Sequence, residues 1–483
     1  MTSTVKWDGQ LGETFDNICG VLQGGVSSPQ LFKVFLEDLV RYLDTSYGVK
    51  INEKMICHLL LADDLALISE SRYGLQQLLY GFQNFCKQWH LVVNMDKTKF
   101  SIFNDKLICS PDTTPILYNN EEVKQTSDYV YVGINVSTDK KRFASHLENV
   151  ADSANKAIFA AMSLAKNAIG GEMSALTYLH IFDTQIRPIL EYGSVIWFNN
   201  QSIEVLEKVQ TKYLKRALGV GDSTPHLALY GDTGKFPLLL RQRYAFLKFW
   251  VRLTQMSQGT ILRDIYEEHM LLNTPYMVKV RSALEVTGII PDELPIVNKE
   301  NTNFFLRIIR NNNEFIFKSM WYNEINDTEN NPMLRFYKYF KTEFKPESYI
   351  KLISNRRLQK CLSQFRLSSH CLRIHKGRQE RDKFGRNTPS NKRFCLSCGS
   401  SQIDDELHLI FTCTTHNNER ESMFSKLQNY LNPNQTHSLS NTDLLNLIIN
   451  SSDGSVLYEL SKFLSTAFRK RKLEYLDRMN GIE

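Results

Sequence analysis

The feature of the sequence that most constrains its fold is a pair of adjacent carboxylates, Asp63 and Asp64, in the middle of an otherwise apolar run. Buried charge is costly unless it is paired or binds a metal ion. The apolar residues on both sides predict a β-hairpin, with residues 56–61 and 65–69 as strands and residues 62–64 as the turn. Paired aspartates at such a turn suit hard divalent cations, which prefer oxygen ligands.

Two carboxylates on one turn also indicate metal-assisted phosphoryl transfer. Two divalent ions about 4 Å apart can hold the attacking and leaving oxygens of a phosphoryl transfer. On this stretch alone a solvated Asp-Asp turn is the better explanation, because aspartate is common in turns. The interpretation therefore depends on the neighbouring segments.

A glycine-containing loop and a helix precede the aspartate pair. Gly24 and Gly25 permit unusual backbone angles or the close approach of a ligand. Ser28 followed by Pro29 predicts a helix start with a hydroxyl cap. Apolar residues at helical spacing extend this predicted helix to about Gly48.

The next segments complete an alternation of helices and strands. Residues 6–20 predict a strand pair with a loop, and residues 71–90 predict a second amphipathic helix with Cys86 and Trp89 as packing residues. Short strands are expected at 92–94 and 100–103. This order predicts an α+β fold with helices on an antiparallel sheet.

Three segments in this order resemble the palm motifs of non-LTR (LINE-type) retrotransposon reverse transcriptases. They are Gln23-Gly24 with residues 28–32, Leu61-Ala62-Asp63-Asp64, and Asn94-Met95-Asp96-Lys97-Thr98-Lys99. The resemblance covers residues 5–136. It implies RNA-directed DNA synthesis that uses Mg²⁺, an RNA template, a DNA primer and deoxynucleoside triphosphates.

The resemblance also implies roles for particular residues. Asp63 is the preferred direct ligand of Mg²⁺ and Asp64 a second one, while Lys97 or Lys99 lies near the leaving pyrophosphate. The candidate contacts to the nucleotide or the template are Gln23, Gly24, Ser28 and Pro29.

The sequence departs from the family pattern in one respect. The family carries a further catalytic aspartate on a strand before the Gln-Gly loop, whereas here only Asp8 and Asp16 precede that loop. Neither lies in an apolar strand, and Gly9 after Asp8 signals a turn. We therefore expect the chain to begin inside the palm, without the fingers, and to have little or no polymerase activity alone.

Beyond the palm, residues 115–118 and 129–136 flank a polar turn at Asn119-Asn120 and predict a hairpin. The family uses such a hairpin to support the primer end, but a surface hairpin is equally consistent with the residues. Apolar spacing from Arg142 to Leu218 predicts three long helices, the second interrupted at Pro188.

By the resemblance, these three helices form a thumb that holds the primer–template duplex. Lysines on the polar side of the third helix would then bind phosphate in a salt-sensitive way, or they are ordinary solvated residues. Further helices are expected as far as residue 341, with loops at 311–313 and 326–332.

A basic segment runs from Lys351 to Arg393 and contains thirteen lysines and arginines but only two acidic residues. Its net charge of +11 exceeds the +6 of the whole chain. Such a segment is typical of phosphate binding, although a solvated basic loop also explains it.

A metal-binding pattern follows the basic segment. Cys395, Cys398, His408 and Cys413 have the spacing Cys-x2-Cys-x9-His-x4-Cys, which predicts a closed, structural Zn²⁺ site. His416 is a substitute ligand. Zinc knuckles of this type also occur C-terminal to the polymerase in LINE-type proteins, and residues 364–370 resemble that region as well. No nuclease is expected after it.

The tail is predicted to be helical at 444–449 and 456–479, with four basic residues at 469–472. That cluster could bind phosphate or an import receptor, although a solvated helix end explains it better. The predicted domains are a partial palm at 1–136, a thumb-like region at 137–255, a helical connector at 256–345, the basic segment with its zinc knuckle at 346–420, and a tail at 421–483.

Composition excludes other classes of protein. No apolar run reaches about 18 residues, so no membrane span is expected, and the first residues lack a secretory h-region. Nine scattered cysteines favour a reducing compartment over a disulfide framework. We expect an intracellular protein, nuclear or nucleocytoplasmic; the oligomeric state is not predicted.

Three functional hypotheses follow from the sequence. The first is a fragment of a non-LTR reverse transcriptase, and the second is a non-enzymatic nucleic-acid-binding remnant that acts through residues 351–413 and the thumb. The third is an untranslated or unstable relic, because a truncated palm leaves a sheet edge unpaired, which invites aggregation.

Overall fold

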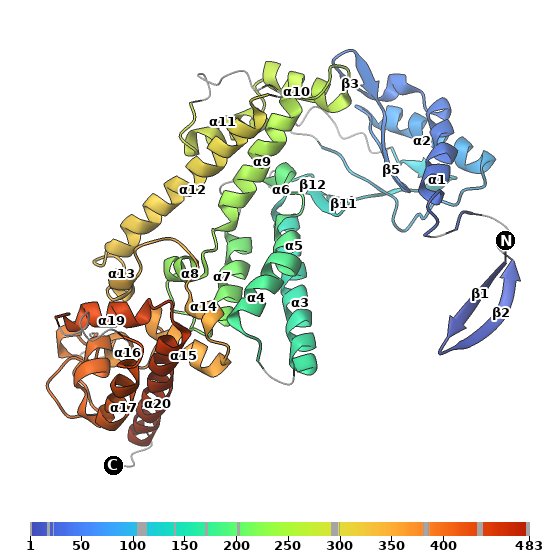
Figure 1. Ribbon diagram of the computed structural model, residues 1–483. Coiled ribbons are helices and arrows are strands. Elements are labelled where there is room, and N and C mark those ends of the chain that lie inside the picture. The colour runs from blue at the N-terminus through green and yellow to red at the C-terminus, as the bar shows by residue number, and fades with distance from the viewer. Residues whose placement is uncertain are drawn as a thin grey trace. The chain divides into compact units, whose positions relative to one another are not determined.

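The computed structural model describes residues 2–16, 20–22, 24–103, 114–139, 142–169, 172–199, 203–290, 298, 300–378, 380, 385, 387–431 and 438–479. They divide into two compact units (Figure 1). Unit 1 comprises residues 1–146 and 256–274, and unit 2 comprises residues 147–255 and 275–483.

The strands of unit 1 pair two by two. Five of the pairs are antiparallel, and β7 with β10 is parallel, so the predicted antiparallel sheet appears in the described residues as separate short ladders. The strands are β1 (Thr2–Trp7), β2 (Gln10–Asp16), β3 (Val49–Ile51), β4 (Lys54–Ile56), β5 (His58–Leu61), β6 (Asp64–Leu67), β7 (Lys99–Phe100), β8 (Leu117–Tyr118), β9 (Glu121–Glu122), β10 (Lys124–Gln125), β11 (Asp128–Tyr131) and β12 (Ile134–Ser137).

The hairpin predicted around the aspartate pair is confirmed as β5–β6. Its register places Leu61 opposite Asp64, so the turn has two residues and Asp64 already belongs to the second strand. Ile56 was predicted in the first strand, but it ends β4 and pairs with Val49 of β3. The separate β3–β4 hairpin arises because Asn52 takes a left-handed backbone, with φ +51°, and reverses the chain.

The helices of unit 1 are α1 (Ser28–Glu37), η1 (Asp38–Tyr42), η2 (Thr45–Tyr47), α2 (Arg72–Gln88) and α10 (Ile261–Leu271). Helix α2 confirms the prediction at residues 71–90, and the Ser71 side chain caps it by accepting a hydrogen bond from the Gly74 amide. The first predicted helix was too long. After Glu37 the chain continues as the tighter 3-10 helix η1, and the Tyr42 carbonyl lies against Gly81 of α2. A Cβ added at Gly81 would be 2.1 Å from that oxygen.

The core of unit 1 forms where α1, η1 and α2 pack against the hairpins. Its buried residues are Leu36, Leu39, Leu43, Cys57, Leu78, Phe85 and Cys86 in one cluster and Leu79, Ile116, Tyr118 and Val123 in another. Cys86 is therefore a packing residue as predicted. Trp89 lies at the edge of the core with 37% of its surface exposed, although it contacts Phe35 edge to face.

The segment after α2 differs from the prediction. Residues 92–94 form no strand, and β7 covers only the start of the predicted strand at 100–103. The single hairpin expected across 115–136 is two hairpins, β8–β9 and β11–β12. Asn119 and Asn120 make the first turn and Val132 and Gly133 the second, all with positive φ, so each strand pairs with its nearest neighbour.

Helix α10 joins unit 1 although it lies far along the chain. Lys54 of β4 forms an ion pair of 2.7 Å with Asp264, and the Asn52 amide donates to Glu268 Oε1 at 2.6 Å. These contacts attach α10 to the β3–β4 hairpin.

Unit 2 is helical. Its helices are α3 (Ala144–Ile169), which enters the unit at Leu147, α4 (Ala175–Ile181), η3 (Phe182–Ile186), α5 (Arg187–Glu191), α6 (Ser194–Trp197), α7 (Glu204–Leu218), α8 (His226–Thr233), α9 (Leu238–Thr254), α11 (Pro275–Val286), α12 (Thr302–Asn326), η5 (Pro332–Leu334), α13 (Tyr337–Phe340), α14 (Tyr349–Leu352), α15 (Arg356–Arg366), α16 (Arg373–Lys376), η6 (Ser390–Lys392), η7 (His408–Thr412), η8 (Thr414–His416), α17 (Asn417–Leu427), α19 (Asn441–Ile449) and α20 (Gly454–Met479). Within the described residues, no helix of either unit is long and apolar enough to cross a membrane.

Most helices of unit 2 lie where the periodicity predicts them. Helices α3, α7 and α20 match their predicted spans, and the interruption expected at Pro188 appears as the wide π-helical turn η3 followed by α5. The loop predicted at residues 311–313 is wrong, because these asparagines lie inside α12. Asn313 is buried there; its amide donates to the Leu240 carbonyl at 2.8 Å and accepts from Arg243 at 2.8 Å.

This buried asparagine yields a stability prediction. We expect Asn313→Ala to lower the free energy of unfolding by about 2 to 3 kcal/mol, because it removes the side-chain partner of the buried Arg243 guanidinium and the hydrogen bond to the Leu240 carbonyl. Urea denaturation measures the change. Asn311→Ala, at an exposed position on the same helix, is the matched control and should change stability by less than about 0.5 kcal/mol. Equal effects of the two substitutions would contradict the assignment.

Candidate functional site

Asp63 and Asp64 lie at the tip of the β5–β6 hairpin in unit 1. Ala62 takes a left-handed backbone with φ +53°, and both aspartates are exposed. Leu65 and Leu67, on the strand that follows, pack on the core of the unit. A two-residue turn whose second strand packs on a core therefore presents both carboxylates to solvent.

Tyr131 of β11 is a neighbour of this turn that the sequence analysis did not include. Burial raises the pKa of the Tyr131 hydroxyl, and the charge of Asp64 raises it further. In the part of the chain that the structure describes, no third histidine, cysteine or acidic residue joins the pair in a compact cluster of ligand atoms. The turn thus offers the carboxylate oxygens of two residues to a cation.

The glycine loop before α1 is held by its own serine. The Leu22 carbonyl accepts from the Gly25 amide at 3.0 Å and from the Ser28 hydroxyl at 2.6 Å. A Cβ at Gly25 would lie 2.6 Å from that hydroxyl oxygen, so the close approach requires glycine. Ser28 was predicted as the helix cap, but it is the first residue of α1 and its hydroxyl closes the loop instead.

The other predicted contacts to nucleotide or template have different settings. Gly24 has φ +84° and is exposed, as is Pro29 in the first turn of α1. Gln23 lies outside the described residues. Lys97 is exposed on a turn that its own amide closes by donating to Asn94, and no described hydrogen bond or ion pair connects it to the aspartate turn.

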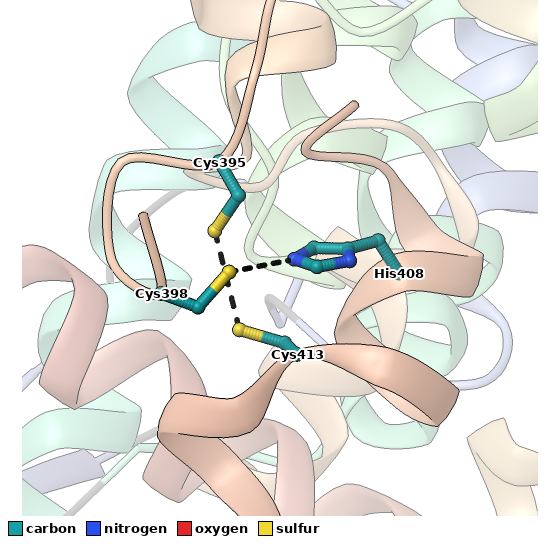
Figure 2. Close-up of side chains that lie close together, drawn as sticks. All are labelled: Cys395, Cys398, His408 and Cys413. Atoms are coloured by element: carbon teal, nitrogen blue, oxygen red, sulfur yellow. Dashed lines mark hydrogen bonds between the residues drawn. The ribbon is translucent and has the colours of Figure 1, made fainter. Parts of the chain in front are cut away.

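The four predicted zinc ligands come together in unit 2 (Figure 2). The sulfur atoms of Cys395 and Cys413 are 4.0 Å apart, and Cys398 Sγ is 3.4 Å from His408 Nε2. Tetrahedral Zn²⁺, with Zn–S bonds of about 2.3 Å and Zn–N bonds of about 2.0 Å, requires about 3.8 Å and about 3.5 Å for such pairs. These four side chains therefore fit a structural Zn²⁺ ion.

Local backbone hydrogen bonds build this centre. Phe394 and Ile403 form a β-bridge, the Cys395 amide donates to the Gln402 carbonyl at 2.8 Å, and Gly399 turns the loop with φ +65°. At the other end, the Cys413 amide donates to the His408 carbonyl at 2.8 Å across the π-helical turn η7. Cys395 and Cys398 thus lie on one turn, and His408 and Cys413 lie on another.

Two residues outside the predicted ligand set complete the centre. His408 Nδ1 contacts Gln402 Oε1 at 2.7 Å; if it donates there, Nε2 is left unprotonated and faces the sulfur atoms. The guanidinium of Arg471 donates to Cys395 Sγ at 3.1 Å and to Cys413 Sγ at 3.2 Å. Arg471 was predicted at a solvated helix end, which is wrong because its side chain is buried against the knuckle.

His416, the predicted substitute ligand, lies outside the ligand cluster. Its Nε2 accepts from Arg471 Nε at 3.3 Å. Within the ligand set, the hydrogen bond between the two thiol groups lowers the pKa of Cys395 to about 2 and raises the pKa of Cys413. Cys395 is therefore the more acidic thiol of the pair, and the thiolate is the form that binds metal ions.

A second buried cluster lies beside the first and was missed by the sequence analysis. Glu406 Oε1 accepts from His370 at 3.2 Å and from His375 at 3.1 Å, and Arg335 binds its other oxygen. The Leu372 amide donates to His370 Nδ1 at 3.4 Å, which assigns the His370 proton to Nε2, facing Glu406. This is a hydrogen-bonded carboxylate rather than a second metal centre, since a protonated nitrogen cannot bind a metal ion.

The charges of the basic segment are mostly used inside unit 2. Arg356, Arg366 and Arg393 are buried, while Lys360 and Arg373 are paired with Glu172 and Glu380. Of its ten described cations, those exposed to solvent are Lys351, Arg357, Lys376 and Lys392. The surface available to phosphate is therefore smaller than the net charge indicates, because several of these charges hold the fold together.

Comparison with known proteins identifies the first part of the chain. Residues 2–136 match the family model described as reverse transcriptase (RNA-dependent DNA polymerase). This match places the Asp63–Asp64 turn inside the matched domain. Together with the relatives below, it confirms the resemblance to non-LTR retrotransposon reverse transcriptases.

Three relatives from Drosophila melanogaster carry related names. The RNA-directed DNA polymerase from mobile element jockey is 25% identical over 45% of this chain and 24% of its own length. The Pol polyprotein from type-2 retrotransposable element R2DM is 32% identical over 28% of this chain and 13% of its own length. The probable RNA-directed DNA polymerase from transposon BS is 31% identical over 39% of this chain and 21% of its own length. The matched part thus spans a quarter or less of each relative.

The buried histidine at Glu406 predicts a pH dependence. Burial lowers the pKa of His375 to about 4, although Glu406 acts in the opposite direction. Below the unfolded pKa of about 6.5, the unfolded chain binds a proton that the native chain does not, so the free energy of unfolding falls as the pH decreases. When the pH is lowered from 7 to 5, the free energy of unfolding of His375→Asn should fall by about 2 kcal/mol less than that of the wild type. Urea denaturation at the two pH values measures this difference.

His180→Asn is the control for this experiment, since His180 is exposed in the same unit. Its pH dependence should equal that of the wild type. The contribution of bound metal to the pH dependence is common to all three chains. A wild-type slope in His375→Asn would show that His375 does not titrate as its burial requires.

The ligand geometry predicts the metal content. We expect the purified chain to hold one Zn²⁺ ion by atomic emission, and Cys413→Ser to lose most of it, because three ligands remain. Cys361→Ser, at a half-buried thiol outside the cluster, should keep the wild-type content. Retention of a full equivalent by Cys413→Ser would refute the assigned ligand set.

Proposed function

We propose that this chain contributes a metal-binding palm turn and a nucleic-acid-binding helical unit to RNA-directed DNA synthesis of the non-LTR retrotransposon type. The observation that carries the proposal is the pair Asp63 and Asp64 on a tight, exposed hairpin turn inside the matched reverse transcriptase domain. The substrates are an RNA template, a DNA primer and deoxynucleoside triphosphates.

The residues of unit 1 have complementary roles in this proposal. Asp63 and Asp64 hold Mg²⁺, which when bound would stabilise negative charge on the attacking and leaving oxygens. The loop that Ser28 closes presents Gly24 and Pro29 to the template or the incoming nucleotide. Lys97 compensates the negative charge of the leaving pyrophosphate. The packing of β6 on the core favours catalysis because it helps to hold the carboxylates in place before the substrate arrives.

Unit 2 supplies binding rather than chemistry. The proposed structural Zn²⁺ site is formed by Cys395, Cys398, His408 and Cys413, and four protein ligands leave no open position for catalysis. The proposed functional parts are the thumb at 137–255, the connector at 256–345, the knuckle segment at 346–420 and the tail at 421–483. Residues 137–146 of the thumb and 256–274 of the connector belong to unit 1. A nuclear location is also proposed, and like the substrates it rests on the similarity to non-LTR retrotransposon reverse transcriptases.

The second candidate function is nucleic-acid binding without catalysis. It is favoured by the compact zinc-ligand geometry and by four exposed cations of the same unit, Lys351, Arg357, Lys376 and Lys392. Binding of this kind weakens steeply with salt, because phosphate neutralisation releases counterions. Removal of Zn²⁺ should weaken it further.

The test compares the wild type, Asp63→Asn and the control Glu122→Gln, which changes an exposed carboxylate of the same unit. We expect Asp63→Asn to bind Mn²⁺ at least about 10-fold more weakly in the presence of primer–template and nucleotide, since it loses a direct ligand. Titration with the paramagnetic ion measures the affinity.

Primer extension with Mg²⁺ in the same samples separates the two functions. The chain alone is expected to extend weakly or not at all, and any extension should disappear in Asp63→Asn and persist in Glu122→Gln. Salt-sensitive primer–template binding without Mn²⁺ binding at the turn would favour the second function. Wild-type Mn²⁺ affinity in Asp63→Asn would refute the proposed metal turn.

A further inference from the structure

The far end of helix α20 contacts the knuckle at several points. Arg471 reaches two of the cysteines, Glu474 accepts a hydrogen bond from Ser397 between the first two cysteines, and Lys470 pairs with Glu419 of α17. Figure 1 shows α20 beside α15 and α17, and it contacts both helices. A segment of five residues thus closes one side of the metal centre.

The guanidinium of Arg471 uses all three of its nitrogens there. Nη1 donates to Cys395 Sγ, Nη2 to Cys413 Sγ, and Nε to His416, while Asp404 Oδ1 lies 3.2 Å from Nη2. Only 7% of the residue is exposed. A buried guanidinium is costly unless it is paired, so these contacts account for its position.

The charge of the centre explains why an arginine suits this place. A Zn²⁺ ion with three thiolates and a neutral histidine carries a net charge of −1. A cation that donates to two of those thiolates offsets this charge inside the fold. Hydrogen bonds to ionised acceptors are about twice as strong as neutral ones, and metal binding keeps both sulfurs ionised.

The remainder of α20 does not depend on the knuckle. Its earlier turns bury an apolar face in the helical core of unit 2, and the buried residues are Val456, Leu457, Leu460, Phe463, Leu464 and Ala467. These residues fix the start of the helix through hydrophobic burial. The end of the helix, by contrast, meets the knuckle through charged and polar side chains.

We propose that Arg471 is a positioning residue of the zinc centre, which hydrogen-bonds two of its thiolates and attaches the end of helix α20 to the knuckle when the metal is bound. The inference rests on the zinc site proposed above. It adds a fifth residue to that site, one that lies 58 positions after the last ligand and touches the sulfur atoms rather than the metal.

The first experiment measures zinc affinity by competition with a chromophoric chelator on the full-length chain. We expect Arg471→Met, which keeps much of the side-chain volume, to bind Zn²⁺ about 10-fold to 100-fold more weakly. Arg471→Lys should lose less, because it keeps the charge but not the two-pronged donor. Lys472→Ala, an exposed cation one position further on, should match the wild type.

The second experiment begins with a measurement on the wild type alone. In the wild type, chelation of the metal should increase the rate of tryptic cleavage after Arg469, Lys470 and Lys472, while sites elsewhere in the chain change less. In Arg471→Met these sites should be cleaved quickly even with Zn²⁺ present. Co²⁺ substitution adds a spectroscopic readout, since the thiolate-to-metal absorption band should shift in Arg471→Met and not in Lys472→Ala.

The outcomes separate this inference from the zinc site itself. A wild-type chain that binds no Zn²⁺ would overturn both. Stoichiometric Zn²⁺ with equal affinity, equal cleavage and an unchanged Co²⁺ spectrum in Arg471→Met would overturn only the role of Arg471. Weaker binding and faster cleavage in Arg471→Met, with Lys472→Ala unchanged, is the expected result.

Discussion

Unit 2 depends on the complete burial of one arginine. Arg366 of α15 donates to both carboxylate oxygens of Asp232 at 3.0 and 3.3 Å, and it lies 2.8 Å from Glu347. Tyr337 and Tyr349 each donate to Asp232 as well, at 3.1 Å. Removing one member of such a pair leaves an uncompensated charge, which typically costs about 3 to 5 kcal/mol. The network joins α8, α13, α14 and α15 and so fixes where α15 ends.

The end of α15 in turn places the candidate zinc site. The chain continues from Arg366 to His370 and His375, which both donate to Glu406, two residues before the ligand His408. Burial would raise the pKa of Glu406, but the two histidines and Arg335 outweigh it and hold the pKa well below its usual value. The carboxylate therefore stays ionised and attaches the knuckle to the helical core.

The two units use aspartate in opposite ways. Asp232 is buried and satisfied by four side-chain hydrogen bonds, so its charge serves the fold. Asp63 and Asp64 are exposed on a tight turn, and their charge is available to a cation. A carboxylate can bind a metal ion only if the fold does not already use it, which is why the candidate catalytic pair lies at the tip of a hairpin.

The sequence by itself determined the features that depend on neighbouring residues. The β5–β6 hairpin, helices α2, α7 and α20, and the spacing of the zinc ligands follow from periodicity and from turns of a few residues, which short-range geometry controls. The Asp-Asp turn and the motifs around it were sufficient to indicate the reverse transcriptase domain.

Only the tertiary structure decided which polar residues are buried. Arg366, Arg393 and Arg471 look like surface cations in the sequence, and Asn313 looks like part of a loop, yet each meets partners from distant segments. Helix α1 ends early for a related reason, since the Tyr42 carbonyl lies against Gly81 of α2. Burial of a polar side chain depends on partners that only the folded chain brings close, and local sequence patterns do not contain that information.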